Sequence, residues 1–294
     1  MTEKLCVIDG TFELFRAYFG APSLQTPQGE ERGAVVGLGQ SLLSLIESGE
    51  FSHLGIAFDS VIESFRNDLY EGYKTGEGIE EELVGQFAPA EEMAAALGLR
   101  VFPMIRYEAD DALASLAAQF SPKFSQVVIA SPDKDLRQCV DGDQVISWDR
   151  MRKVRYDEQA TIEKVGVAPS SIPDWLALVG DTADGIPGVV KWGAKSASKV
   201  LAHYLHLESI PPNSEDWEVQ VRGASGLCAA LAESGDDVFL WRKLARLVQD
   251  VDLKTTKEEL RWRVPPDESW AKLCETWGAS RLLKRAEKAF SSSS

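Results

Sequence analysis

The sequence predicts an α/β protein whose mainly parallel sheet is covered by helices on both faces, followed by a helical region. Short apolar runs that are typical of buried strands alternate with helical patterns over the first half of the chain. Two of these runs end directly in an aspartate, as expected where strand ends line a ligand site. Near Val165 the alternation gives way to helices. We therefore expect a first domain over residues 1–164 and a helical region over residues 165–294.

The elements follow from apolar periodicity and from turn residues. In the first region we expect strands at 5–8, 53–58, 99–102, 127–129 and 145–148, a hairpin at 151–156, and helices from about 12, at 33–48, at 90–97 and from about 108. In the second region we expect helices within 174–201, at 226–234 and 238–249, and a final helix at 268–290, with a loop or linker at 208–219. The strands at 5–8 and 53–58 deliver Asp9 and Asp59 at their carboxyl ends.

Acidic residues dominate the stretch 107–135, which carries five carboxylates in two clusters, YEADD and SPDKD. A helix beginning near Glu108 would aim its first-turn acids the same way, and Asp133 and Asp135 would share one side after a strand. Converging carboxylates repel one another and raise their pKa values, so such a group needs protons or cations. A divalent metal is our leading explanation.

The segment 64–82 contains SFRNDLYEGYK and then an acidic run at 80–82. We expect a mobile, partly helical segment over the sheet, in which Arg66 and Lys74 are the cations. Spacing alone supports a solvated loop with ordinary surface charges equally well.

Farther along, Asp181 and Asp184 follow an apolar helix, and IPG leads into a turn at 188–193. Two helices joined by such a turn expose backbone N–H groups suited to one DNA-strand phosphate, which Lys191, Lys195 and Lys199 would strengthen. A plain surface helical hairpin is the alternative.

A phosphatase of the haloacid dehalogenase type is the first competitor, because IDGT and VGDTADG look like parts of its signature. That chemistry needs a nucleophilic aspartate two residues before Asp9, where this chain has Val7. The mechanism would then lack its first step.

The whole set of motifs resembles the 5′ nuclease family, which includes the 5′-3′ exonuclease domain of bacterial DNA polymerase I, phage 5′ exonucleases and flap endonucleases. The matching motifs are VIDG, AFD, SFRxxxYxxYK, YEADD, SPDKD and GDxxDxIPG, in order over roughly residues 4–200. The resemblance implies a PIN-like α/β core with a helical arch and a helix-three-turn-helix element at about 174–201. It also implies hydrolysis of DNA phosphodiester bonds by a stand-alone 5′-3′ exonuclease or flap endonuclease.

By this resemblance two Mg²⁺ or Mn²⁺ ions assist hydrolysis, and nine acids hold them. The first ion would take Glu108, Asp110, Asp9, Asp59 and Asp133, and the second Asp111, Asp135, Asp181 and Asp184. Lys74 and Arg66 would contact the scissile phosphate, and Asp9 and Asp133 would count with them as catalytic residues. The DNA-binding candidates are Arg16, Gly188, Lys191, Gly193, Lys195, Ser196 and Lys199. A monovalent cation, K⁺, is a further candidate at the helical hairpin.

Six positions depart from the family pattern. Glu77 stands where a basic residue is common, and Glu80–Glu82 make the expected arch acidic, which would weaken or alter the threading of a flap. Phe15 replaces a frequent tyrosine, and Lys191 replaces an expected glycine in the hairpin.

Composition and sequence patterns limit the possible localisation, metal sites and partners. With 44% hydrophobic and 26% charged residues, no signal-peptide pattern and no apolar run near the roughly 20 residues of a membrane span, we expect a cytoplasmic monomer without a membrane partner. The four cysteines show no CxxC pair, and His203 and His206 lack a third ligand for zinc. A net charge of −15 argues against nucleic acid. If nine of the 46 acids bind metal, however, the excess over the 31 basic residues falls to six.

Two other functions stay open. A non-catalytic DNA-binding protein could keep the fold, although a full set of acids argues against it. A ribonuclease acting on RNA–DNA hybrids is the nearer alternative, because PIN-like cores also cut RNA. The expected partner is DNA with 5′ ends, flaps or nicks.

Overall fold

The structure is a computed structural model, and it describes residues 3–291. The chain divides into two compact units that interleave along the sequence. The first unit comprises Met1–Ile62, Gly76–Ser131 and Gln249–Ser294, and the second comprises Glu63–Thr75 and Pro132–Val248. The division at residue 164 expected from the sequence stays a prediction.

The first unit is built on four parallel strands. They are β1 (Lys4–Asp9), β2 (His53–Asp59), β3 (Arg100–Met104) and β4 (Gln126–Ala130), in the spatial order β3-β2-β1-β4. In the register, Ile8 lies opposite Ile56 on β2 and Ala130 on β4. The central strands are apolar on both faces because helices cover both, as is typical of parallel sheets.

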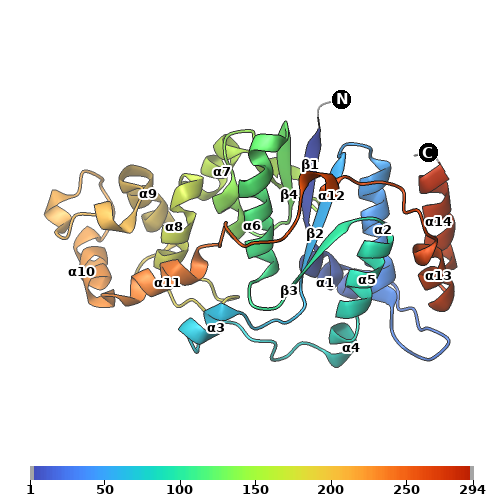
Figure 1. The fold of residues 1–294 in the computed structure, drawn as a ribbon. Coiled ribbons are helices and arrows are strands. Elements are labelled where there is room, and N and C mark those ends of the chain that lie inside the picture. The colour runs from blue at the N-terminus through green and yellow to red at the C-terminus, as the bar shows by residue number, and fades with distance from the viewer. Residues whose placement is uncertain (1–2, 292–294) are drawn as a thin grey trace. The chain divides into compact units, whose positions relative to one another are not determined.

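Helices pack on each side of these strands, as Figure 1 shows. The helix α6 (Ala109–Phe120) contacts all four strands, and α1 (Gly10–Gly20), α2 (Gly33–Glu47) and α5 (Phe87–Ala96) form the opposite layer. Outside that layer lie α13 (Ser269–Thr276) on α5 and α14 (Ser280–Ser291) on α2. The short elements are α4 (Glu81–Val84), α12 (Lys257–Leu260) and the 3-10 turn η1 (Ser121–Lys123).

The second unit combines a hairpin with helices. Its strands β5 (Val145–Asp149) and β6 (Val154–Tyr156) are antiparallel, with Trp148 opposite Arg155. Its helices are α3 (Phe65–Leu69), α7 (Glu158–Val165), α8 (Ile172–Val179), α9 (Ala194–Tyr204), α10 (Ala224–Ser234) and α11 (Asp237–Ala245). Single 3-10 turns are η2 (Asp135–Cys139), η3 (Pro169–Ser171), η4 (Leu207–Ser209) and η5 (Ser214–Asp216).

The core of the second unit explains its apolar helix pattern. Leu176, Leu178, Val200 and Leu201 are buried there, and the indole of Trp192 packs among them. These side chains repeat at helical spacing on α8 and α9, so that the two helices bury a shared apolar face.

Glycine is required in the turn between α8 and α9. Gly188 has a φ of +74°, and a Cβ there would lie 2.5 Å from the backbone nitrogen of Gly180. An L side chain would be strained in that conformation and would also collide with the backbone. Asp181 and Ile186 pair across the same turn through two backbone hydrogen bonds of 2.8 Å.

The predicted fold class, a mainly parallel sheet flanked by helices with a C-terminal helical region, is confirmed. The single helix expected at 268–290 is wrong, because two helices occupy this stretch. Gly278 adopts a φ of +70°, and the N–H of Ala279 donates to the carbonyl of Cys274 at 2.7 Å, which ends the first helix. Strand alternation also does not apply to Asp133 and Asp135, because β4 ends at Ala130 and Asp135 begins a 3-10 turn.

None of the helices over residues 3–291 has the length and apolar run that crossing a bilayer requires.

Candidate metal centre

Three aspartates of the second unit converge on one point, and we call them the three-aspartate group: Asp135, Asp181 and Asp184. Their ligand oxygens all lie within 4.8 Å of one another. Asp135 opens η2, while Asp181 and Asp184 belong to the tight turn that follows α8. The backbone pairing of Asp181 with Ile186 holds that turn in shape. The local folds of two segments 46 residues apart in the chain therefore bring the carboxylates together.

Asp135 is unfavourably placed for an ionised carboxylate. Its side chain is buried, and its Oδ1 has no hydrogen-bond partner. Burial raises the pKa of Asp135 well above its ordinary value, and the negative charges of Asp133, Asp184 and Asp181 raise it further. A buried, unsatisfied carboxylate oxygen beside two other carboxylates fits the oxygen-only ligand set that hard divalent cations prefer. The group thus has the composition and spacing of a divalent-cation site.

Two lysines contact the three-aspartate group. The Nζ of Lys134 lies 2.7 Å from Oδ2 of Asp181, and the Nζ of Lys74 lies 3.0 Å from Oδ1 of Asp184. Burial alone would lower the pKa of Lys134, but the bond to Asp181 and the charges of Asp135 and Asp181 raise it overall. Both ammonium groups therefore offset part of the negative charge.

Asp133, which the sequence also proposed as a ligand, has a local structural contact. Its Oδ1 accepts a hydrogen bond of 2.8 Å from the backbone N–H of Asp135. This bond fixes the start of η2, so Asp133 orients the segment that carries Asp135.

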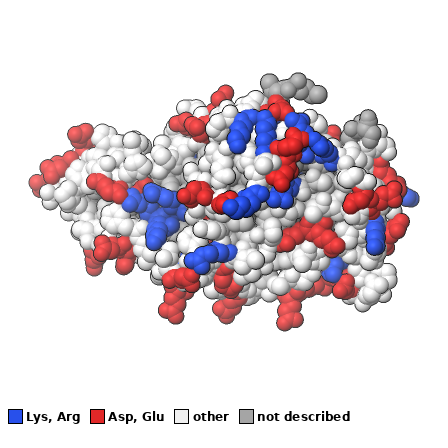
Figure 2. Space-filling view, in the orientation of Figure 1, with Lys and Arg blue, Asp and Glu red and all other residues white. Residues whose placement is uncertain are grey.

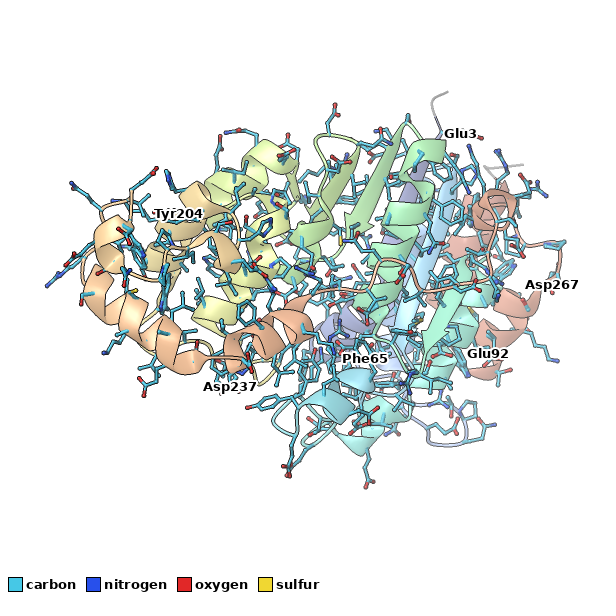
Figure 3. All side chains as sticks on the ribbon, turned by 60° about the vertical axis from the view of Figure 1, so that its left-hand side comes forward. Glu3, Phe65, Glu92, Tyr204, Asp237 and Asp267 are labelled. Carbon is cyan, nitrogen blue, oxygen red and sulfur yellow. The ribbon has the colours of Figure 1, made fainter. Side chains whose placement is uncertain are left out.

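Arg66, a predicted phosphate contact, lies inside the second unit with 1% of its surface exposed. Its Nε donates to the carbonyl of Leu244 at 2.8 Å, and its Nη2 donates to the carbonyl of Arg246 at 3.1 Å. Its guanidinium carbon lies 4.7 Å from the ring of Phe65, which Figure 3 labels. These bonds tie α3 to the end of α11, and the phosphate contact stays a prediction.

Five of the predicted acids belong to the first unit: Asp9, Asp59, Glu108, Asp110 and Asp111. Asp9 ends β1 and caps α1, since its Oδ1 accepts from the N–H of Phe12 at 2.8 Å. Its Oδ2 accepts from the hydroxyl of Ser131 at 2.8 Å. The structure therefore places Asp9 at the carboxyl end of its strand, as the sequence predicted.

The N-terminus of α6 collects the other acids of the first unit. The N–H of Ala109 donates to Oδ1 of Asp59 at 2.7 Å, so the acid that ends β2 reaches the start of this helix. Glu108 caps the helix, and its own N–H donates to Oδ2 of Asp111 at 3.0 Å. Carboxylates are favoured there by the unpaired N–H groups of the first turn.

The connection between α8 and α9 presents basic side chains, as predicted. Lys191, Lys195 and Lys199 are exposed, and Ser196 caps α9 by accepting from the N–H of Gly193 at 3.1 Å. Lys191 has a φ of +71°, the conformation that glycine adopts most readily. The unusual lysine therefore keeps the backbone that the expected glycine would have.

Arg16, the remaining DNA-binding candidate, pairs with buried Glu13 and donates to the hydroxyl of Ser41 at 2.9 Å. On the face that Figure 2 draws, basic and acidic side chains are interspersed.

Comparisons with known proteins decide the family. Residues 4–166 match the model of the 5′-3′ exonuclease N-terminal, resolvase-like domain, and residues 167–268 match that of the 5′-3′ exonuclease C-terminal SAM fold. The chain belongs to the 5′-3′ exonuclease family. The resemblance seen in the sequence is thereby confirmed, and the phosphatase alternative is rejected.

Relatives of this family member differ in length. A 5′-3′ exonuclease of Aquifex aeolicus is 32% identical over 98% of this chain and 96% of its own length. DNA polymerase I of Mycobacterium leprae is 35% identical over 87% of this chain, which spans only 28% of that enzyme. The family models and the relative of similar length are all named for 5′-3′ exonuclease activity, which is the nuclease activity that the motifs predicted.

Solved structures support the fold. T5 5′-exonuclease with bound zinc matches with a TM-score of 0.69 and 17% identity, over 98% of this chain and 99% of that one. The catalytic core of Rad2 in complex with DNA substrate matches with a TM-score of 0.65 and 13% identity, over 100% and 92%.

Sequence reasoning missed two residues that contact the acids, Lys134 and Ser131. Both stand in the SPDKD motif that was singled out for its aspartates. The available signal was a basic residue between two acids, although nothing in the sequence shows that it pairs with Asp181.

Proposed function

We propose that this member of the 5′-3′ exonuclease family hydrolyses DNA phosphodiester bonds at 5′ ends, flaps or nicks, assisted by two divalent cations. The observation that carries the proposal is the three-aspartate group with the unpartnered Oδ1 of Asp135. Such a group stays ionised at moderate cost only with cations beside it.

Mg²⁺ or Mn²⁺ is the proposed ion, because both take oxygen ligands and the proposed ligands are all carboxylates. One ion would be held by Asp135, Asp181 and Asp184, and another by the first unit's Asp9, Asp59, Glu108 and Asp110. Asp111 and Asp133 are further proposed ligands. Bound ions of this kind activate water and stabilise negative charge on a phosphate and its leaving oxygen.

Side chains of the chain itself would bind and orient the substrate. The ammonium of Lys74 is proposed to bind the scissile phosphate, whose negative charge can replace that of Asp184 as its partner. For Arg66 we propose a positioning role, because it joins α3 to the end of α11 and so fixes the segment that leads to Lys74.

The turn between α8 and α9 is proposed to bind one phosphate of duplex DNA. Gly188 and Gly193 allow the backbone to approach, while Lys191, Lys195 and Lys199 supply positive charge. A K⁺ ion at this turn is a further proposal, supported by the glycine-like backbone at Lys191. We also propose residues 1–164 as the nuclease domain, and a cytoplasmic monomer as the working form.

Cleavage assays test this function. Purified protein is incubated with Mg²⁺ or Mn²⁺ and end-labelled 5′-flap, nicked duplex, single-stranded DNA and RNA–DNA substrates. We expect cleavage of the flap or nicked DNA, dependent on the added ion. Tight binding without cleavage of any substrate would favour the non-catalytic alternative, and preference for the hybrid would favour the ribonuclease.

Two substitutions separate chemistry from binding. Asp133→Ala is expected to reduce cleavage by several orders of magnitude while duplex binding is kept. Lys195→Ala is expected chiefly to weaken duplex binding and to lower its salt dependence, because one phosphate contact is lost. Lys164→Ala, an exposed lysine on α7, is the matched control. Equal loss of cleavage with unchanged binding in both test variants would contradict this division.

A further inference from the structure

Lys134 has no place in the proposed function, yet it makes a short ion pair in the candidate metal centre. Its Nζ lies 2.7 Å from Oδ2 of Asp181, and its side chain is less than half exposed. Its carbonyl accepts from the N–H of Arg137 at 3.2 Å, which anchors its backbone at the start of η2. The ammonium is therefore held beside the three-aspartate group by a short, ordered segment.

Both carboxylate oxygens of Asp181 already have partners. Oδ1 accepts from the backbone N–H of Ala183 at 2.9 Å, and Oδ2 contacts Lys134. The amide belongs to the tight turn and has little freedom to move, whereas a lysine side chain has four rotatable bonds. A cation that takes Asp181 as a ligand would therefore displace the ammonium rather than the amide.

Charge leads to the same expectation. The three carboxylates lie within 4.8 Å of one another, and Asp135 is buried, so the group needs another counter-charge when no metal ion is bound. A divalent cation and an ammonium on the same carboxylate would repel each other at short distance. The two therefore bind Asp181 alternately.

We propose that Lys134 is a built-in competitor of the divalent cation at the three-aspartate group. Its ammonium neutralises Asp181 when that ion is absent and leaves Asp181 when the ion binds. Lys134 thereby lowers the affinity of this one site and stabilises the metal-free protein. The inference rests on the proposed function only in taking the group as an ion site.

Removal of the positive charge of Lys134 should raise the affinity for Mn²⁺ and lower the stability of the metal-free protein. An ion pair this exposed alters an equilibrium constant by up to about fivefold. Lys134→Met should therefore tighten Mn²⁺ binding at the three-aspartate group by about threefold to fivefold and lower the melting temperature in chelator. Lys134→Arg keeps the charge and should stay close to the wild type in both measurements.

The experiment titrates the full chain with Mn²⁺ alone, without DNA, and measures free Mn²⁺ by electron paramagnetic resonance. Lys164→Met is the matched control, an exposed lysine of the same unit outside the group. Asp181→Asn and the double variant with Lys134→Met complete a double-mutant cycle. In the Asp181→Asn background, Lys134→Met should change Mn²⁺ binding by less than about twofold, because the pair no longer exists.

The outcomes distinguish a failure of the competitor role of Lys134 from a failure of the ion site itself. If Asp181→Asn weakens Mn²⁺ binding but Lys134→Met leaves it unchanged, the competitor role is refuted and the metal site stands. If Lys134→Met weakens binding, the lysine supports the site rather than competing, which also refutes the inference. If Asp181→Asn itself has no effect on Mn²⁺ binding, the ion site of the proposed function fails, and this inference fails with it.

Discussion

Asp135→Asn should stabilise the metal-free protein although it removes a proposed ligand. The substitution keeps the shape of a buried side chain and removes its charge. Two unit charges 4.8 Å apart, the upper limit within the group, repel by about 3.5 kcal/mol at an effective dielectric constant near 20. Lys134 and Lys74 offset part of this repulsion. We therefore expect a net gain of about 1–2 kcal/mol in the free energy of unfolding, or roughly 2–3 °C in melting temperature for a chain of 294 residues.

Asp174→Asn is the matched control, a buried aspartate of the same unit with the opposite surroundings. Its carboxylate accepts from Nη1 of Arg242 at 2.9 Å and from the N–H of Leu207 at 3.3 Å, and it contacts Nδ1 of His206 at 3.0 Å. Loss of that charge weakens the ion pair between buried Asp174 and Arg242, so we expect this variant to lose about 3 kcal/mol of the free energy of unfolding.

Urea unfolding in chelator at pH 8 measures both variants. The folded-state pKa of Asp135 is raised, so its proton stabilises the metal-free protein at low pH, and this stabilisation is lost as the pH rises through that pKa. The gain from Asp135→Asn should therefore shrink as the pH is lowered from 8 toward 4. Added Mn²⁺ should raise the stability of the wild type more than that of the variant. A loss of stability in Asp135→Asn comparable to that of the control would refute this reasoning.

Arg242→Met should cost about 3 kcal/mol in the free energy of urea unfolding because it removes the cationic partner of buried Asp174, whereas Glu208→Gln should cost less than about 1 kcal/mol because Glu208 is exposed. The bonds from Arg242 lower the pKa of Glu208 to about 2 from an ordinary 4.5. The difference in the free energy of unfolding between Glu208→Gln and the wild type should therefore narrow as the pH falls from 4.5 toward 2. Lys191→Gly should raise the free energy of unfolding by about 1 kcal/mol or less, since a φ of +71° disfavours lysine; an unchanged or lower value would contradict a strained backbone. Gly10→Ala should lower the free energy of urea unfolding by about 2 kcal/mol, because the added Cβ would lie 2.6 Å from the ring of Phe58.

Prediction from the sequence succeeded where the local structure depends on residues that are neighbours in the chain. The apolar runs ending in Asp9 and Asp59 are strands with their acids at the carboxyl ends, since a strand buried on both faces must be apolar throughout. The same reasoning failed at 268–290, where continuous helical periodicity hid the break at Gly278. An apolar pattern with helical spacing can continue across a break between two helices. The pattern does not reveal that a glycine at the break adopts a positive φ.

The amino-acid sequence by itself determined the α/β class, the motif order that marks the family, and the acids proposed to hold metal. Each depends on residue type and spacing, which determine strand and helix formation and the charge available to a cation. Only the tertiary structure decided which carboxylates of the second unit meet, that Asp135 carries an unpartnered oxygen, that Arg66 is buried, and that Lys134 pairs with Asp181. These facts depend on contacts between segments far apart in the chain, and ion pairing and desolvation follow from distance and burial in space rather than from spacing in sequence.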